Sequence, residues 1–431
     1  MIRPTRSAPL ALLGAVTAAE AAVLLLRGRQ AAIVPARVQP QAYFSADDVR
    51  RARAYRRPQL ALTLLDSALA ASLLARLARR PPAALGRVAR RSDALGAAGS
   101  GVALSLGLSA AGLPLGAIAH VRAVRAGLST QSWRGWWADL ARSTAITTPL
   151  AGAGGALLAE LKRRWPQRWW LPGAAAAVGV SAGFVVAGPV LLDPVFNSFT
   201  PLPEGQLRDD VLELARRAGV RVGEVFEVDA SRRTTAANAY VTGLGPTKRV
   251  VLFDTLLKSF SAAETRLVVA HELAHVRHRD VQRGLVLTAL MAAPLLRAIQ
   301  LLGERIAVRG AAADAGRVGT TEPTAAETLP AVVLAAAAAS LAVGPVASQL
   351  SRAIERRADA FALELTRDPE PFIGFERRIV AQNLADPAPP RWLTALTASH
   401  PPAIERVGAA LAFAQREGIA LEPPADLPAD G

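Results

Sequence analysis

Seven long apolar runs constrain the fold of this 431-residue chain more than any other feature. They cover about 8 to 26, 59 to 77, 94 to 121, 143 to 161, 169 to 192, 284 to 303 and 329 to 350, each close to the roughly 20 residues that a helix needs to cross a bilayer. Arginine clusters lie between many of these runs. We therefore expect a mainly α-helical polytopic membrane protein with about seven transmembrane helices.

The composition and the placement of charge agree with this reading. Hydrophobic residues make up 51% of the chain, and the mean hydropathy is +0.25. The formal net charge is +15, but the basic residues gather at the ends of apolar runs, as do tryptophans such as Trp133 and Trp170. This distribution is typical of membrane interfaces. It favours anionic lipid as the partner and argues against nucleic acid.

Three of the runs leave alternatives open. The second carries Asp66 and the fourth is short and rich in glycine, so each could be a buried helix. The first has the basic start of a signal peptide, but its apolar stretch continues to Leu26, and we expect an uncleaved helix. A carboxylate at the depth of Glu20 should face other helices or a water-filled space. Basic residues are shared equally between the two sides, so they assign no orientation.

The motif HELAH, residues 271 to 275, carries the chemistry. On a helix, His271 and His275 lie one turn apart on the same face, where both imidazoles can bind one zinc ion. Glu272 lies beside them and could act as general base towards a water that the metal activates. Ser261 and Glu264 form a capping-box pattern that supports a helix here. Two incidental histidines on a surface helix are the alternative.

Such a site needs a third protein ligand. Because the chain has no cysteine, this ligand must be a histidine, an aspartate or a glutamate. Among the other histidines, His278 follows on the same helix among charged residues, and we interpret it as solvated. Glu355 and Asp359, again one turn apart, offer one carboxylate to the metal and another to a ligand histidine. Taken alone, they would be an ordinary charged helix face.

The segment before the motif has the pattern of a small α+β unit. Residues 204 to 219 predict an amphipathic helix, residues 225 to 228 a strand, and residues 234 to 257 two strands around a turn at Gly243 to Lys248. The outer strand could pair with an extended peptide and carry its scissile bond past the metal. A plain structural hairpin is the alternative.

Several segments together resemble the type I CAAX prenyl endopeptidases, a family of membrane gluzincins whose near relatives are the HtpX-type membrane proteases. The segments are HELAH, the later ERRAD, NAYVTGLGPTKRVVLFDTLL before the motif, FNSFTPLPEG at 196 to 205, SHPPAIERV at 399 to 407, STQSWRGWWADL at 129 to 140 and FSADDVRRARAYRR at 44 to 57. The layout is also similar, with five spans before the motif and two between it and Glu355. The resemblance covers nearly the whole chain up to about residue 415.

The resemblance implies a zinc metalloendopeptidase with one Zn²⁺ per chain. It implies His271, His275 and Glu355 as ligands, Glu272 as general base and Asp359 as support for a ligand histidine. It further implies that two residues, Asn238 and His400, approach the substrate and could stabilise the oxyanion. For His400, a histidine at a helix start before Pro401 and Pro402 is the alternative. The implied fold is a helical bundle around a wet chamber, closed by a small zinc-protease domain.

We therefore expect five regions. These are an N-terminal region of five spans at 1–193, a first catalytic part at 194–283, two spans with a flexible loop (about 304 to 328) at 284–350, a second catalytic part at 351–415 and a disordered tail at 416–431. The substrate would be a membrane-associated or C-terminal, CAAX-like protein segment, and the composition suggests a bacterial cytoplasmic membrane. The alternatives are an intramembrane site-2-type protease and a non-enzymatic membrane chaperone or scaffold with a structural zinc.

Overall fold

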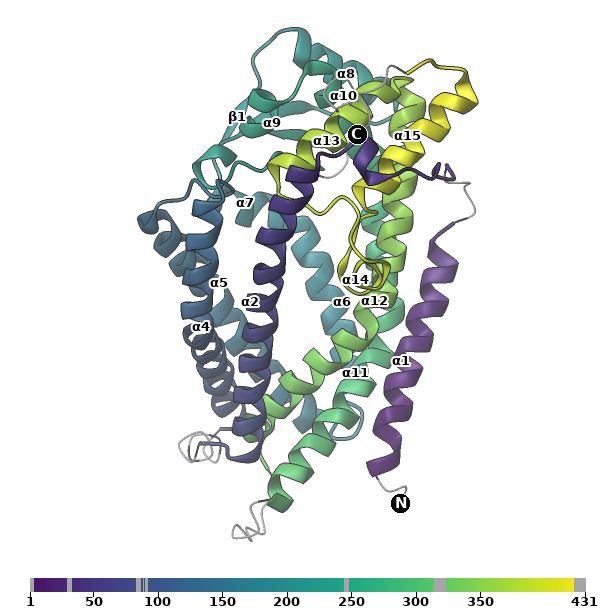
Figure 1. Ribbon diagram of the computed structural model, residues 1–431. Helices are drawn as coiled ribbons and strands as arrows, with labels where there is room; N and C mark the ends of the chain where they lie inside the picture. The colour runs from purple at the N-terminus through teal and green to yellow at the C-terminus, as the bar shows by residue number, and fades with distance from the viewer. Residues whose placement is uncertain are drawn as a thin grey trace.

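A computed structural model describes residues 4–28, 33–82, 87, 89, 92–243, 248–313 and 323–421. Long helices form a bundle, and a smaller domain that contains a β-sheet covers one end of it (Figure 1). Within the described residues, six helices are long and apolar enough to cross a membrane. Their bounds are α1 (Pro4–Leu26), α2 (Ala46–Arg79), α4 (Asp93–Arg125), α6 (Trp170–Ala187), α11 (Asp280–Ala313) and α12 (Ala325–Thr366). The expected polytopic helical bundle is confirmed.

The fourth predicted run lies in α5 (Trp133–Arg164), which is not one of these six helices because small and polar residues dilute its apolar stretch. α5 nevertheless packs along α4 over much of its length. Glycines make this close approach possible. A Cβ atom added at Gly101 would lie 2.2 Å from the carbonyl oxygen of Ala151, and one at Gly155 would lie 2.2 Å from that of Ala97. Small residues at a helix crossing are a common way to pack helices in a membrane.

Glu20 of α1 faces another helix, as expected for a carboxylate at membrane depth. Its Oε2 accepts a hydrogen bond of 3.3 Å from the side-chain amide of Gln349 on α12. α1 also packs against α11, where Ala15 and Ala19 are buried beside Met291. The first apolar run is therefore an integral part of the bundle.

The capping domain is built on a four-stranded sheet with the order β1-β2-β4-β3. The strands are β1 (Phe199–Pro201), β2 (Glu224–Val228), β3 (Ala239–Thr242) and β4 (Arg249–Phe253). β2 and β4 are parallel, and the other two pairs are antiparallel. The predicted strands at 225 to 228 and within 234 to 257 are present, although residues 244–247 of the predicted turn lie outside the described residues. β3 is at one end of the strand order.

Helices α8 (Gln206–Arg217), α9 (Asp254–Ser259) and α10 (Ala262–Arg277) accompany this sheet. α8 corresponds to the predicted amphipathic helix and buries Val211 and Leu214. α10 begins at the predicted capping box of Ser261 and Glu264. Val269 and Leu273 of α10 are fully buried in the same core as β4 residues, so one face of the helix is fixed on the sheet.

The rest of the domain comes from distant parts of the chain. It contains α13 (Pro369–Gln382) and α15 (Ala403–Glu417), whereas α14 (Arg391–Thr397) lies beside α12 (Figure 1). The shorter elements of the chain are 3-10 turns at Pro40–Ala42 and Ala230–Arg232, a π-helical turn at Gly188–Leu192 and α7 (Asp193–Phe196). The predicted loop at 304 to 328 is helical up to Ala313 and again from Ala325, and residues 314–322 lie outside the described residues. α15 extends past the predicted start of the tail, whose residues 422–431 are also outside them.

A loop of the bundle holds the segment that leads into β3. Arg233 pairs with Asp139 of α5 through two contacts, Nε to Oδ2 at 2.6 Å and Nη2 to Oδ1 at 3.0 Å. The hydroxyls of Thr234 and Thr235 donate to the carbonyl oxygens of Leu128 and Gly127. These contacts join the membrane helices to the strand that runs beside α10.

Candidate metal centre

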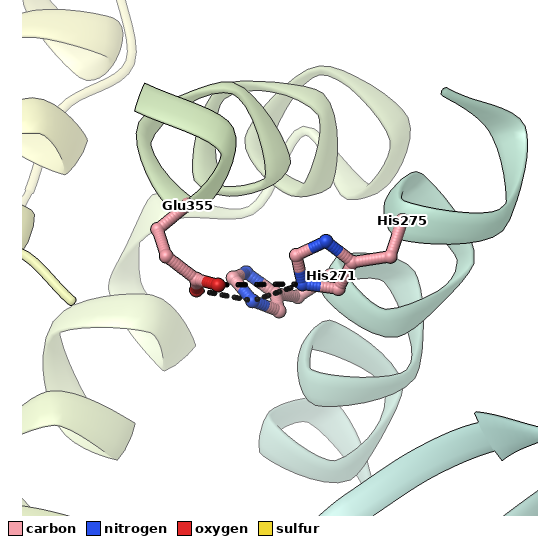
Figure 2. A group of neighbouring side chains, drawn as sticks. All are labelled: His271, His275 and Glu355. Atoms are coloured by element: carbon pink, nitrogen blue, oxygen red, sulfur yellow. Dashed lines mark hydrogen bonds and ion pairs between the residues drawn. The ribbon is translucent and has the colours of Figure 1, made fainter. Parts of the chain in front are cut away.

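Three side chains predicted as ligands meet at the junction of two helices (Figure 2). His271 and His275 extend from α10, and Glu355 extends towards them from α12. The Nε2 atom of His271 lies 3.2 Å from Nε2 of His275 and 3.2 Å from Oε2 of Glu355. Nε2 of His275 lies 3.8 Å from Oε1 of Glu355. The sequence separates these helices, and the fold brings them together.

The geometry of these atoms fits one metal ion. With zinc–nitrogen distances of about 2.0–2.1 Å, two ligand atoms of a tetrahedral site lie about 3.3 Å apart. The observed separations of 3.2 to 3.8 Å are close to this value. Oε2 of Glu355 is buried and accepts no hydrogen bond of normal geometry among the described residues, although Nε2 of His271 lies 3.2 Å from it. Two imidazoles and one carboxylate are also a known ligand set of catalytic zinc sites.

The electrostatics of the cluster also call for a cation. Burial opposes a charge on His271, but its contacts with Asp359 and Glu355 outweigh burial and raise the pKa of its imidazole to about 10. In the protein alone, a proton on this ring would therefore balance the surrounding carboxylates, and a bound divalent ion can supply the same positive charge. Glu272 lies next to the two histidines, and burial raises the pKa of its carboxyl above the ordinary value.

Asp359 lies where the sequence predicted a supporting carboxylate. Its Oδ1 is 2.9 Å from Nδ1 of His271, on the side of the ring away from Glu355. Arg406 of α15 holds Asp359 through two contacts of 2.6 and 2.9 Å, and it also reaches Oε1 of Glu376 on α13 at 2.5 Å. Sequence reasoning did not single out Arg406 or Glu376. Arg406 stands in SHPPAIERV, a segment on which the resemblance relies.

Glu376 is buried, and one arginine serves both it and Asp359. Burial raises the pKa of the Glu376 carboxyl to about 7, although the Arg406 charge opposes the shift. The pKa of the Arg406 guanidinium is raised, because the nearby carboxylates outweigh the cost of burial. Burial, and after it the negative charge of nearby Asp359, explains why Glu376 keeps its proton more readily than an ordinary glutamate.

The charged surroundings expected for His278 are not open solvent. Asp280, one of the charged residues near it, is buried, and its Oδ2 lies 3.1 Å from Nδ1 of His275. His278 is half buried, not solvated, and its ring meets the edge of Phe361 with centroids 5.4 Å apart. The sequence shows Asp280 as a carboxylate five positions after His275. It does not show that the turn between α10 and α11 brings this carboxylate back to the histidine.

The two residues implied near the substrate lie in different surroundings. Nε2 of His400 is 3.3 Å from Oε2 of Glu355, and its Nδ1 is 2.8 Å from the Ser399 hydroxyl, so the loop after α14 brings this histidine to the cluster. Its side chain is 62% exposed and accessible to a substrate. Asn238 is exposed immediately before β3, and its Oδ1 accepts a hydrogen bond of 3.0 Å from the N–H of Ala239. β3 itself packs against α10.

The position of α10 bears on the intramembrane alternative. This helix has 16 residues, is not one of the spanning helices, and packs on the sheet of the capping domain. The motif therefore lies in a domain at one end of the bundle and not inside an apolar span (Figure 1).

Comparisons with known proteins identify the family of this chain. The model of peptidase family M48 matches residues 201–414. The chain is 31% identical over 304 residues to the uncharacterized metalloprotease YhfN of Bacillus subtilis, and this alignment covers 70% of each protein. It is 32% identical over 182 residues to CAAX prenyl protease 1 of Saccharomyces cerevisiae, and this alignment covers 41% of this chain and 40% of the yeast protein.

The fold has a counterpart in the crystal structure of S. mikatae Ste24p. The TM-score is 0.69 at 21% identity, and the alignment covers 95% of this chain and 100% of that one. The resemblance stated from the sequence is confirmed, and relatives that are metalloproteases argue against a non-enzymatic scaffold. The family match and the Bacillus relative show that the chain belongs to peptidase family M48, as a membrane metalloendopeptidase with CAAX prenyl proteases among its relatives.

Proposed function

We propose that this protein is a zinc-dependent endopeptidase in which His271, His275 and Glu355 hold one zinc ion. The observation that carries the proposal is that one ligand atom from each residue lies within 4.8 Å of the other two. Zinc is the metal that best fits a ligand set of two imidazoles and one carboxylate with a position left open for chemistry. The catalytic unit would combine 194–283 with 351–415, on either side of the spans at 284–350.

The roles of the surrounding residues follow from their positions. Zinc held by these side chains would polarise the substrate carbonyl and lower the pKa of a water towards about 7. Glu272 accepts the proton of the attacking water, and its raised pKa makes it a stronger base than an exposed glutamate. Asp359 orients His271 through Nδ1. His400 and Asn238 approach the substrate and stabilise the oxyanion that forms during attack.

β3 provides the place for the substrate backbone. It is the last strand in the sheet order and packs against α10. Among the described residues, no strand pairs with the outer edge of β3. An extended peptide that pairs with this edge would gain main-chain hydrogen bonds and run alongside the metal helix. The contact between Arg233 and Asp139 would keep this edge in place relative to the bundle.

The substrates we propose are membrane-associated proteins or proteins with a CAAX-like C-terminal segment. The yeast relative named as a CAAX prenyl protease supports this class, and the Bacillus relative supports a bacterial cytoplasmic membrane as the location. Peptides with a prenylated, an unmodified and an amidated C-terminus separate the possibilities. Preference for the prenylated free acid supports CAAX-like processing, and equal rates support general cleavage.

The function is tested with detergent-solubilised protein and an unstructured fluorogenic peptide. We expect cleavage that a chelator stops and zinc restores. Glu272→Gln should reduce turnover by at least 10²-fold while keeping bound zinc, since a general base contributes about 10²–10⁴-fold. Glu213→Gln, which changes an exposed glutamate of α8, is the matched control and should behave as wild type. Unchanged turnover in Glu272→Gln would remove the base assignment.

A further inference from the structure

Asp280 is a buried residue outside the HELAH motif, and its carboxylate contacts a histidine of that motif. It is the first residue of α11, and its Oδ2 lies 3.1 Å from Nδ1 of His275. Its Oδ1 accepts a hydrogen bond of 3.0 Å from Arg283 and contacts the guanidinium of Arg357 on α12. Both oxygens are therefore engaged, one by the histidine and the other by two arginines.

The turn between α10 and α11 places this carboxylate. Arg279 adopts a left-handed backbone conformation with φ of 57°, which is uncommon for a residue other than glycine. The chain reverses there, so that the first residue of α11 faces back towards the last turn of α10. A strained backbone conformation is retained when the surrounding contacts fix it. The contacts of Asp280 with His275 and Arg357 are among those that hold this turn, together with the backbone hydrogen bonds of Arg279.

The surroundings of His275 repeat those of His271. At His271, Nδ1 meets Asp359 and that carboxylate is held by Arg406. At His275, Nδ1 meets Asp280 and that carboxylate is held by Arg357. In both cases the ring nitrogen that faces Glu355 is Nε2. Each histidine thus has its own carboxylate and its own arginine.

This arrangement has a direct chemical consequence. A neutral imidazole that donates its Nδ1 proton to a carboxylate must leave the lone pair of Nε2 free. The negative charge also makes that nitrogen a stronger ligand and fixes the ring orientation. Arg357 places a positive charge beside the buried carboxylate of Asp280 and offsets the cost of its burial.

We propose that Asp280, held by Arg357, is a positioning residue that fixes the tautomer and orientation of His275 at the metal centre. The proposal rests on the proposed role of His275 as a ligand. Asp280 also ties α11 to α12, and a purely structural role would follow from that tie alone. The two roles predict different zinc affinities for a variant that loses the contact between α11 and α12 but keeps the Asp280 carboxylate.

The test measures zinc affinity of the full chain in detergent, after removal of metal, by competition with a chromophoric chelator. Asp280→Ala should weaken zinc binding about 10- to 100-fold, the usual cost of losing such a partner. Asp280→Asn should have a smaller effect, because its amide oxygen can still accept the Nδ1 proton. Asp210→Asn removes the carboxylate that pairs with Arg266 elsewhere on α10 and should leave zinc affinity within twofold.

Arg357→Gln separates positioning from a structural role. It breaks the tie to α12, but Asp280 remains beside His275 with Arg283 as its partner. We expect Arg357→Gln and Asp280→Ala to lower the melting temperature of the metal-free protein alike, while only Asp280→Ala weakens zinc binding strongly. Equal losses of zinc affinity in both variants, or wild-type affinity in Asp280→Ala, would overturn the inference. A wild-type protein that binds no zinc would remove the proposed function as well.

Discussion

The Nε2 atom of His271 lies 3.2 Å from Oε2 of Glu355, although between these residues the chain runs out along α11 and returns along α12 (Figure 1). The contact therefore depends on the packing of the bundle as well as on the capping domain. A change that shifts α12 along its axis by one residue would move Glu355 by about 1.5 Å. The positions of the three proposed ligand residues therefore depend on the packing of the membrane helices.

The crossing of α4 and α5 provides a test of bundle packing. Gly155→Ala would place its Cβ 2.2 Å from the carbonyl oxygen of Ala97, so the helices must separate. We expect a loss of about 1–3 kcal/mol in stability, visible as a lower melting temperature in detergent. Gly154→Ala is the control, since no atom lies within 4 Å of its added Cβ. Equal melting temperatures for the two variants would contradict the close packing.

Pairing of the substrate with the outer edge of β3 can be tested with proline. The N–H of Phe253 donates to the carbonyl oxygen of Asn238, so by the alternation of an antiparallel pair the N–H of Val241 faces away from β4. Val241→Pro removes that donor without breaking the ladder. We expect kcat/KM for a peptide to fall about tenfold, the equivalent of one hydrogen bond of about 1.4 kcal/mol.

The neighbouring position is the control for this edge. The N–H of Tyr240 faces β4, so Tyr240→Pro should lower the melting temperature, whereas Val241→Pro should not. Wild-type kcat/KM in Val241→Pro would show that the substrate does not pair with β3.

Glu376 predicts a specific dependence of stability on pH. Its carboxyl has a pKa of about 7 in the folded protein against an ordinary value of 4.5, so the folded state binds more protons between these values. The stabilisation is complete below about pH 4.5 and is lost as the pH rises through about 7, and the loss amounts to about 3 kcal/mol. Glu376→Gln cannot titrate, and its melting temperature should fall less over this window. Parallel curves for wild type and Glu376→Gln would contradict the assignment.

The apolar runs and the HELAH motif were readable from the sequence because each depends on local spacing. Membrane spans follow from runs of about 20 apolar residues, and α10 follows from its capping box and its apolar face. Glu20 could be assigned to a helix interface because a carboxylate at that depth is costly in lipid. Its partner, Gln349, could not be predicted, since it lies on a distant helix.

The residues that sequence reasoning missed all act through long-range contacts. Arg406 reaches Asp359 from α15, and Arg357 reaches Asp280 from α12. On its own helix each is one charged residue among several, so spacing gives no reason to separate it from an ordinary surface arginine. Asp280 was not recognised because its burial depends on the backbone turn at Arg279. Helix periodicity does not encode such a turn.

The central claim is that α10 and α12 hold one metal ion together, and metal content tests it most directly. Wild-type protein purified with zinc and dialysed should keep one equivalent, and Glu364→Ala, which changes an exposed glutamate of the same helix, should keep it too. Glu355→Ala should lose the ion under the same dialysis, because two imidazoles one turn apart leave the site without its third ligand. A full equivalent of tightly bound zinc in Glu355→Ala would contradict the account.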